Sequence, residues 1–183
     1  MSPSTLLLSE PFMQDENFLR SVVLVCEHDL EDGTVGFILN QPTNLVISDV
    51  IPDLPPEVNH PLFIGGPVSQ ETLHFIHKCP DRVSDGIELG HGVTWGGNYE
   101  ELMIHLAAGT IRHDEIKFFL GYSGWDPDQL AEEIKEQSWM RCEQYNPDLL
   151  FVIDSENLWR EALIAMGPKY ASIANYPIDP RLN

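Results

Sequence analysis

The stretch SVVLVCEHDLEDGTVGFILN, residues 21–40, decides the fold more than any other part of the sequence. Ser21–His28 is a continuous apolar and β-branched run, which is typical of a strand buried on both faces. Asp29–Gly33 has the composition of a turn, and Thr34–Asn40 predicts a second strand that returns beside the first. We therefore predict a β-hairpin with a loop of about five residues. It should end at Pro42, because proline cannot donate a hydrogen bond to a central ladder.

Further elements follow outward from this hairpin. Apolar runs predict strands at Leu6–Leu8, Leu62–Ile64, Leu73–His77, Gly86–Leu89, Ile116–Tyr122 and Leu149–Ile153. Caps and helical spacing predict helices at Leu45–Ile51, from the Asn98 and Glu101 capping box to Ala108, from the Asp126 cap onward, and from Asp154 or Ser155 to Met166. Strict β-α-β alternation fails over the first 90 residues. We expect about eight strands in a mixed, mostly antiparallel sheet, with three or four helices packed outside it.

The composition is globular, with a strongly acidic charge balance. The chain has 183 residues, of which 29 are acidic and 10 are basic, and its formal net charge is −19. Residues 1–77 hold eleven of the carboxylates and a single basic side chain, Arg20. Binding to duplex DNA requires clustered Lys and Arg, so we expect no direct nucleic-acid contact. The length suits one domain over residues 1–183, with a core at about 4–167 and a C-terminal tail at 168–183.

Cysteine content and hydropathy indicate a reducing, aqueous compartment. The three cysteines, Cys26, Cys79 and Cys142, are widely spaced and form no C-x-x-C motif, which favours reduced thiols over a disulfide framework. The apolar run Val22–Cys26 is much shorter than the roughly 20 residues of a membrane-spanning helix. The first residues also lack the basic start of a signal peptide. We expect a cytoplasmic protein with no membrane partner.

Two short motifs suggest catalysis or metal binding, and each has a structural alternative. Ser123 follows a predicted strand as a nucleophile elbow would, but that motif needs glycine where Trp125 stands. A tight turn is therefore the favoured interpretation. His74 and His77 are three residues apart, yet at that spacing two strand residues point to opposite faces, and no third ligand is evident. We predict no catalytic residue, no cofactor and no metal site.

Arg20 stands at the mouth of the central hairpin and is the most informative single side chain. Across the open end, Arg20 and Ser21 are predicted to face Asn40, which gathers a guanidinium, a hydroxyl and amides suited to a carboxylate or carbonyl ligand. The favoured alternative is a structural pair, because partly buried arginines are usually paired. In either case we expect the guanidinium to contact a carboxylate or backbone carbonyls of residues 65–68 or 121–125.

Three blocks of sequence, taken in order, resemble the AlgH (YqgE-type) family of bacterial proteins. They are Phe18–His28 with Gly33 and Gly36–Pro42, then Gly65–Val68 with Leu73 and His77, and then Phe119–Trp125 with residues from Gln129 to Trp139. With Trp159 and Gly167, the resemblance covers about residues 4–167. Gln41 stands where the family most often has arginine, so a second cation beside Arg20 is missing.

The resemblance implies a mixed α/β domain whose bifurcated β-sheet folds into a pseudo-barrel. It brings no established catalytic residue or cofactor, and the family name comes from a proposed role as a transcriptional regulator of alginate synthesis. We expect a binding or regulatory protein with a protein or small-molecule partner and an oligomeric state left open. The alternative is a hydrolase with a cleft near Arg20, His77 and Ser123. The candidate ligand-binding residues are Arg20, Ser21, Asn40, Gly65, Gly66, His77, Tyr122 and Ser123.

Overall fold

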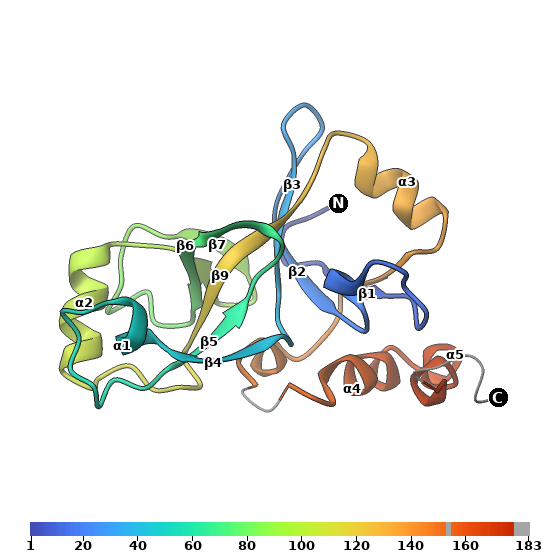
Figure 1. Cartoon of the computed structure of the whole chain (residues 1–183). Helices are drawn as coiled ribbons and strands as arrows, with labels where there is room; N and C mark the ends of the chain where they lie inside the picture. The colour runs from blue at the N-terminus through green and yellow to red at the C-terminus, as the bar shows by residue number, and fades with distance from the viewer. Residues whose placement is uncertain (153–154, 178–183) are drawn as a thin grey trace.

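The computed structural model describes residues 1–152 and 155–177 (Figure 1). The strands are β1 (Leu6–Ser9), β2 (Val22–Asp29), β3 (Gly33–Ile38), β4 (Pro42–Val46), β5 (Pro61–Ile64), β6 (Val68–His77), β7 (Ile87–Gly90), β8 (Val93–Trp95), β9 (Ile116–Trp125) and β10 (Trp139–Cys142). The helices are α1 (Ile47–Val50), α2 (Tyr99–Ala107), α3 (Gln129–Lys135), α4 (Leu158–Ala165) and α5 (Pro168–Ala171). Three 3-10 turns are η1 (Glu16–Phe18), η2 (Pro147–Phe151) and η3 (Ile173–Asn175). The predicted mixed α/β class is confirmed.

The predicted central hairpin is formed by β2 and β3. The two strands pair antiparallel, with Leu24 opposite Phe37 and His28 opposite Thr34. The first five residues of β2 are buried, as the continuous apolar run predicts. β1 pairs with the other edge of β2, and β10 pairs with β1. This half of the sheet therefore runs β10–β1–β2–β3, entirely antiparallel.

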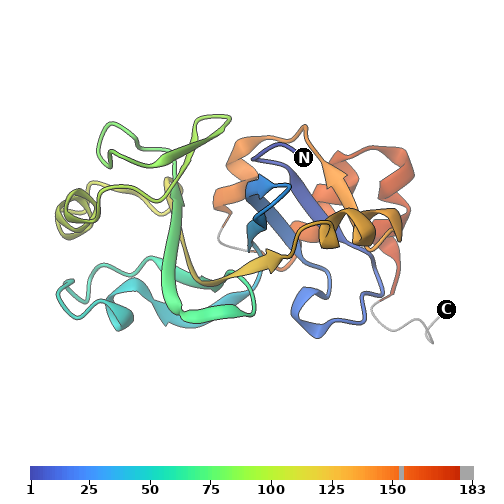
Figure 2. The ribbon, with the colours of Figure 1, turned by 90° about the horizontal axis from the view of Figure 1, so that it is seen from above.

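β9 joins this half to a second one and makes the sheet bifurcate (Figures 1 and 2). Its C-terminal end pairs with β3, where Ser123 lies opposite Gly36, and its middle pairs in parallel with β5. It also pairs antiparallel with β6, which is followed by β8 and β7. The predicted bifurcation is confirmed. The sheet does not close into the pseudo-barrel that the family resemblance implies, because β10 and β7 end the strand order of the described residues without pairing with each other.

The helices pack outside the sheet, and three groups of buried side chains hold them there. α4 packs against β1–β3 through Trp159, and α3 covers the opposite face through Leu130. α1 and α2 pack on the second half through Ile47 and Leu102, which meet Phe118 of β9. Fully burying one such side chain stabilises the fold by about 1.5–3 kcal/mol. Within residues 1–152 and 155–177, no helix has both the length and the apolar character needed to cross a bilayer.

Two predicted elements in the C-terminal third are wrong in type or in boundary. The predicted strand at Leu149–Ile153 is instead the 3-10 turn η2, because Pro147 has a fixed φ and no N–H for a ladder. Ile153 and Asp154 lie outside the described residues. α4 begins after Asn157, later than the predicted cap. β8 and β10 were not predicted, because such short stretches carry little periodicity.

Helix and strand starts elsewhere also differ from the predictions. Pro42 begins β4 instead of ending the pairing, which fits a strand that pairs only with β5. α3 begins after Asp128, not directly after Asp126, and Asp128 has a φ of 65°. The Asn98 cap of α2 is confirmed, because its side chain accepts from the Glu101 N–H at 3.1 Å. The Glu101 carboxylate does not complete a capping box, since it accepts from the N–H and hydroxyl of Ser84.

Candidate functional site

The three sequence blocks of the family resemblance meet at the carbonyl oxygen of Gly65. This oxygen accepts a hydrogen bond from the Ile38 N–H at 2.8 Å and another from the Ser123 hydroxyl at 3.0 Å. The Gly65 N–H in turn donates to the Leu120 carbonyl at 2.9 Å. The blocks therefore do gather in one region, although they gather around a glycine and not around Arg20.

At this junction the backbones of neighbouring segments pack directly against the glycines. A Cβ at Gly65 would lie 2.3 Å from the Gly121 carbonyl oxygen, and one at Gly66 would lie 2.3 Å from the Tyr122 carbonyl. Ser123 is fully buried, and its hydroxyl is committed to a carbonyl acceptor. Only glycine allows backbones to approach so closely. The junction is a packed crossing of β3, β5 and β9. The predicted tight turn at Ser123 is wrong, because Ser123 lies inside β9 and pairs with Gly36 of β3.

His77 lies far from Ser123 along β9. His77 is opposite Ile116, seven residues before Ser123, which is roughly 20 Å at the rise of a strand. The imidazole is fully buried, with Nε2 2.9 Å from the Gly96 carbonyl and Nδ1 accepting from the Cys79 N–H at 3.2 Å. Burial lowers the pKa of His77. The ring is therefore neutral at pH 7, and both nitrogens have backbone partners.

The Arg20 side chain points to the C-terminal part of the chain. Its Nη2 donates to the Tyr176 carbonyl at 2.5 Å, and its guanidinium carbon lies 4.8 Å from the centre of the Trp159 ring. The expected carbonyl acceptor is right, but the expected partners at 65–68 and 121–125 are wrong. Arg20 precedes β2 in a turn with a φ of 50°, so its side chain does not follow the alternation of the strand.

The open end of the hairpin has the predicted composition, and the chain itself occupies the polar groups. The Asn40 Oδ1 accepts from the Val22 N–H, and its Nδ2 donates to the Arg20 carbonyl, both at 2.9 Å. The Gln41 Nε2 lies 3.5 Å from the hydroxyl of Ser21, which is fully buried. Asn40 therefore closes the end of the hairpin by bridging the strand to the turn before it.

The eight candidate residues thus fall into three places. One holds Gly65, Gly66, Tyr122 and Ser123, the second holds Arg20, Ser21 and Asn40, and the third holds His77 alone. The half-buried Tyr122 ring packs edge-on against His74, with centroids 6.0 Å apart. None of the eight lines the groove beside β10 or the cavity beside α2 that are described below.

We expect Arg20→Met to lower the free energy of unfolding by about 1–2 kcal/mol, because it removes a charge-assisted hydrogen bond and a cation–π contact. Urea unfolding measures the loss. Arg160→Met is the matched control, since within the described residues this exposed arginine makes one hydrogen bond, a long one of 3.4 Å to Asn175. Equal stabilities of the two variants would contradict a structural role for Arg20.

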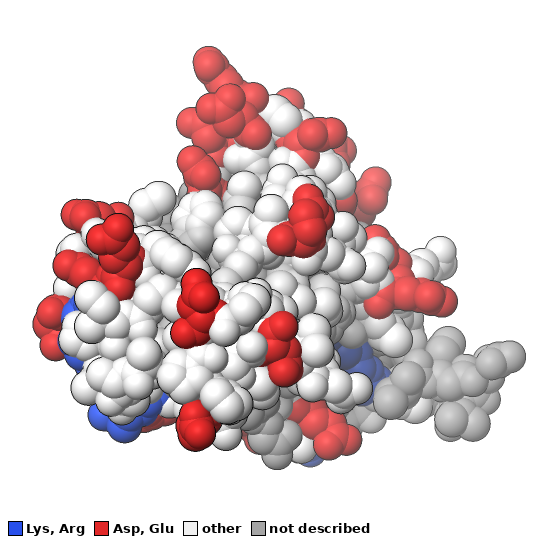
Figure 3. All heavy atoms as spheres, turned by 60° about the vertical axis from the view of Figure 1, so that its left-hand side comes forward, with Lys and Arg blue, Asp and Glu red and all other residues white. Residues whose placement is uncertain are grey.

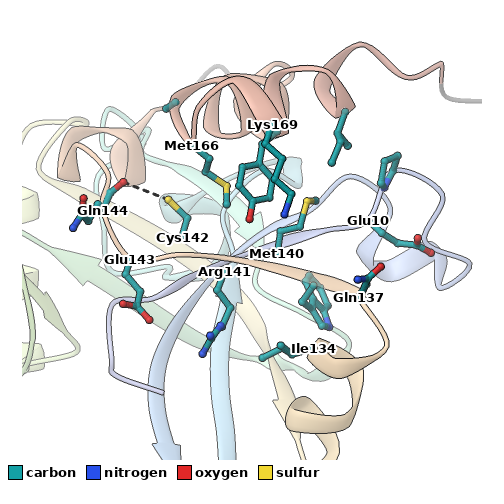
Figure 4. A pocket seen from close by; sticks show the side chains of 15 residues that line it. Glu10, Ile134, Gln137, Met140, Arg141, Cys142, Glu143, Gln144, Met166 and Lys169 are labelled. Atoms are coloured by element: carbon teal, nitrogen blue, oxygen red, sulfur yellow. Dashed lines mark hydrogen bonds between the residues drawn. The ribbon is translucent and has the colours of Figure 1, made fainter.

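An open groove lies between the outer strand β10 and the helices α4 and α5 (Figure 4). Its volume is about 840 Å³, and an unbroken run from Trp139 to Gln144 forms one side. The other side carries Met166, Lys169 and Tyr170. In Figure 4, Lys169 reaches down toward Met140, whereas Arg141 lies on the opposite side of the strand and points away from the helices. The groove therefore follows the edge of β10 and has side chains on both of its faces.

Arg141 and Lys169 are cations that no carboxylate neutralises within residues 1–152 and 155–177. Ion pairs engage Lys78, Arg82, Arg112 and Lys135. Oxygens of carbonyl or amide groups accept from Arg20, Lys117 and Arg160. Glu10 and Glu143 lie near the two ends of the groove (Figure 4). Acidic side chains outnumber basic ones on the face shown in Figure 3, so two cations without an ion pair in one groove set this place apart.

Sequence reasoning missed the groove because it missed β10. The stretch Trp139–Cys142 has four residues, one of them charged, so it carries neither strict alternation nor a continuous apolar run. The signal that exists is chemical: Met140 and Arg141 stand together in a chain that is poor in both residue types. That signal would have indicated residues 140 and 141 as a candidate site, but it would not have predicted that they lie on an edge strand.

A second cavity of about 590 Å³ lies beside the C-terminal end of α2. It is lined by His60 and His113, whose ring centroids are 4.3 Å apart. Burial lowers the pKa of His60 to about 4, and its Nε2 lies 3.2 Å from the Ile111 carbonyl. Its Nδ1 has no partner among the described residues. Within the residues that the structure describes, no group of three or more His, Cys, Asp or Glu side chains could hold a metal ion.

The strand topology defines the class of protein. It is a mixed α/β protein in which one strand, β9, belongs to both halves of a bifurcated sheet. The chain belongs to the AlgH-like family, whose model matches residues 6–171. The resemblance drawn from the three sequence blocks is therefore confirmed.

Curated relatives and solved structures agree with this membership. The chain is 42% identical over 186 residues to a UPF0301 protein of Cytophaga hutchinsonii, with 100% of both chains covered. It is 38% identical to a UPF0301 protein of Chlorobium limicola, covering 100% of this chain and 96% of that one. The solution structure of the AlgH protein from Pseudomonas aeruginosa has a TM-score of 0.74 and 27% identity, with 95% and 93% coverage. A crystal structure from Corynebacterium diphtheriae shares the fold, with a TM-score of 0.76, 23% identity, and 96% and 93% coverage.

Proposed function

We propose that this protein is a binding protein that acts through a protein partner held in the groove between β10, α4 and α5. The observation that carries the proposal is that two unneutralised cations, Arg141 and Lys169, line the groove from opposite faces of β10, with the half-buried Met140 and Met166 on the Lys169 side. Methionine side chains adapt to different apolar surfaces, and cations steer acidic partners. An open groove along a strand also suits a macromolecule better than an enclosed small ligand.

A regulatory role of the kind for which the AlgH family is named would, on this proposal, run through protein contact. Proteins that hold duplex DNA neutralise about 6–10 phosphates, whereas the groove offers two cations on a chain of charge −19. The hydrolase alternative has less support. Arg20, His77 and Ser123 lie apart, and each makes a hydrogen bond to a backbone carbonyl of the chain itself.

We expect Met140→Glu to weaken partner binding at least tenfold, because it places a carboxylate on the apolar side of the groove. Affinity capture from the native cell identifies the partner, and titration of the purified partner against the wild type and against Met140→Glu measures the two affinities. Ile104→Glu is the matched control, since Ile104 is 65% exposed on α2 in the other half of the molecule.

The outcome that supports the proposal is a partner that binds the wild type and Ile104→Glu alike and loses affinity for Met140→Glu. Partner binding must also slow hydrogen exchange at β10. Partners that bind all three proteins equally would contradict the groove as the binding site. A melting temperature for Met140→Glu that matches the wild type would show that the loss is not caused by unfolding.

A further inference from the structure

The backbone of β10 has one free edge, and that edge faces the groove. β10 is the outer strand of its half of the sheet and pairs only with β1 in the described residues. The Glu10 N–H donates to the Ser138 carbonyl at 2.9 Å. By antiparallel alternation, Met140 and Cys142 also turn their backbone groups toward β1. The N–H and C=O groups of Trp139 and Arg141 therefore point outward, into the groove.

Resting on the function proposed above, we infer that the partner enters the groove as an extended segment, pairs antiparallel with β10 and carries acidic side chains on the Arg141 face. Addition of a strand to a free sheet edge is a common mode of peptide recognition, in which backbone hydrogen bonds give affinity and alternate side chains give specificity. The inference uses both properties of the groove, its free edge and its two cations, which form no ion pair with the described residues.

The two faces of β10 impose different side chains on the added strand. Met140 and Cys142 belong to the core on the α4 side, whereas Trp139 packs with Ile134 of α3 on the other. Residues paired with Met140 would therefore be apolar. A residue hydrogen-bonded opposite Arg141 would lie about 5.5 Å away between Cα atoms, close enough for its carboxylate to meet the guanidinium. Lys169 adds positive charge at the helix side of the same groove.

A second copy of this chain fits the edge less well than an acidic segment does. A two-fold antiparallel pairing of β10 with itself about Arg141 sets two guanidinium groups side by side, and like charges opposite each other destabilise a sheet. Each copy also carries a net charge of −19, and this charge is repulsive between copies.

The test uses eight-residue, end-capped peptides in which glutamate and valine alternate, with lysine–valine peptides as the charge control. Binding is followed by NMR titration of the full chain up to millimolar peptide. We expect shifts and slowed exchange at the amides of Trp139 and Arg141, with the lysine–valine peptide binding at least tenfold more weakly. Arg141→Glu should weaken the glutamate–valine peptide at least tenfold, whereas Lys169→Glu should weaken it less, because Lys169 lies on the face of β10 that the valines occupy. Arg160→Glu, the same charge change on an exposed arginine that does not line the groove, should leave it unchanged.

Two backbone-methylated peptides separate strand pairing from simple charge attraction. In the inferred arrangement, the glutamate N–H groups point at β10 and the valine N–H groups point away. N-methylation of the glutamates should therefore abolish binding, whereas N-methylation of the valines should preserve it.

Equal binding of the two methylated peptides would overturn strand pairing. If Met140→Glu still abolished binding of the two methylated peptides, the groove would remain the binding site, although the peptide would not pair with β10 as a strand. Absence of shifts at β10 at millimolar peptide, or equal binding of the lysine peptide, would also overturn the inference. A concentration-dependent dimer with protected β10 amides would overturn it in favour of a second copy.

Discussion

Replacing Gly65 by alanine is expected to lower the free energy of unfolding by about 3 kcal/mol, the upper part of the range for overpacking a dense core. The added Cβ would lie 2.3 Å from the Gly121 carbonyl oxygen and 2.9 Å from the Phe37 ring. A backbone atom cannot rotate away as a flexible side chain can, so β5 and β9 must separate. For a chain of this length the melting temperature should fall by roughly 6–12 °C, which differential scanning calorimetry measures directly.

Gly124→Ala is the matched control for this substitution. The nearest atom to its Cβ would be at the edge of the Tyr122 ring, at 3.3 Å, with Val68 at an ordinary contact distance of 3.9 Å, and Gly124 is exposed on β9. We expect a change below about 1 kcal/mol, because the ring can shift by a few tenths of an ångström. If Gly65→Ala and Gly124→Ala melted at the same temperature, the crossing of the three sequence blocks would not be the tight junction that the distances indicate.

The parts of the fold that could be predicted are those whose sequence carries a long, unmixed signal. Ser21–His28 contains a continuous apolar run and Ile116–Tyr122 is mostly apolar, and both form central strands. β10 could not be found in this way, because its four residues are mixed in both burial and chemistry. The segment that forms η2 was wrongly predicted as a strand because its sequence does carry an apolar signal. Its leucines resemble a strand, but Pro147 at its start decides the local geometry.

The site was harder to predict than the fold, because side-chain direction depends on turns that the sequence does not specify. Asn40 was placed correctly at the open end of the hairpin, since register alone fixes its position. Arg20 was not, because its positive φ aims the guanidinium at a segment 156 residues away along the chain. The groove at β10 is assembled from a strand and two helices, and no local motif encodes that neighbourhood.

Lys117 is a buried cation that the sequence does not distinguish from a surface lysine. It is 3% exposed in the middle of the sheet, with its Nζ 2.7 Å from the Val152 carbonyl and 4.0 Å from the centre of the Phe63 ring. Burial lowers the pKa of this ammonium group to about 7. The free energy of unfolding must therefore depend on pH through this one residue.

The direction of this dependence follows from the protons bound in each state. Between about pH 7 and pH 10.4, the ordinary value for an unfolded lysine, the unfolded chain holds a proton on Lys117 that the folded chain has released. Stability therefore rises with pH across this window, by about 3–5 kcal/mol for a shift of this size. Below pH 7 both states are protonated, and the cost of burying the charge is present in full.

Lys117→Met isolates this effect, because every other titrating group is shared with the wild type. At pH 6 we expect the methionine variant to be the more stable of the two, since it removes a buried charge at the expense of one hydrogen bond to the Val152 carbonyl. By pH 10 the wild type should have gained about 3–5 kcal/mol relative to the variant, which guanidinium unfolding at a series of pH values measures. Lys135→Met is the control, because the Lys135 side chain is 76% exposed and its removal should give a difference that does not change with pH. A constant difference for Lys117→Met as well would mean that its amine stays protonated in the folded protein, and therefore that an anion or water reaches the centre of the sheet.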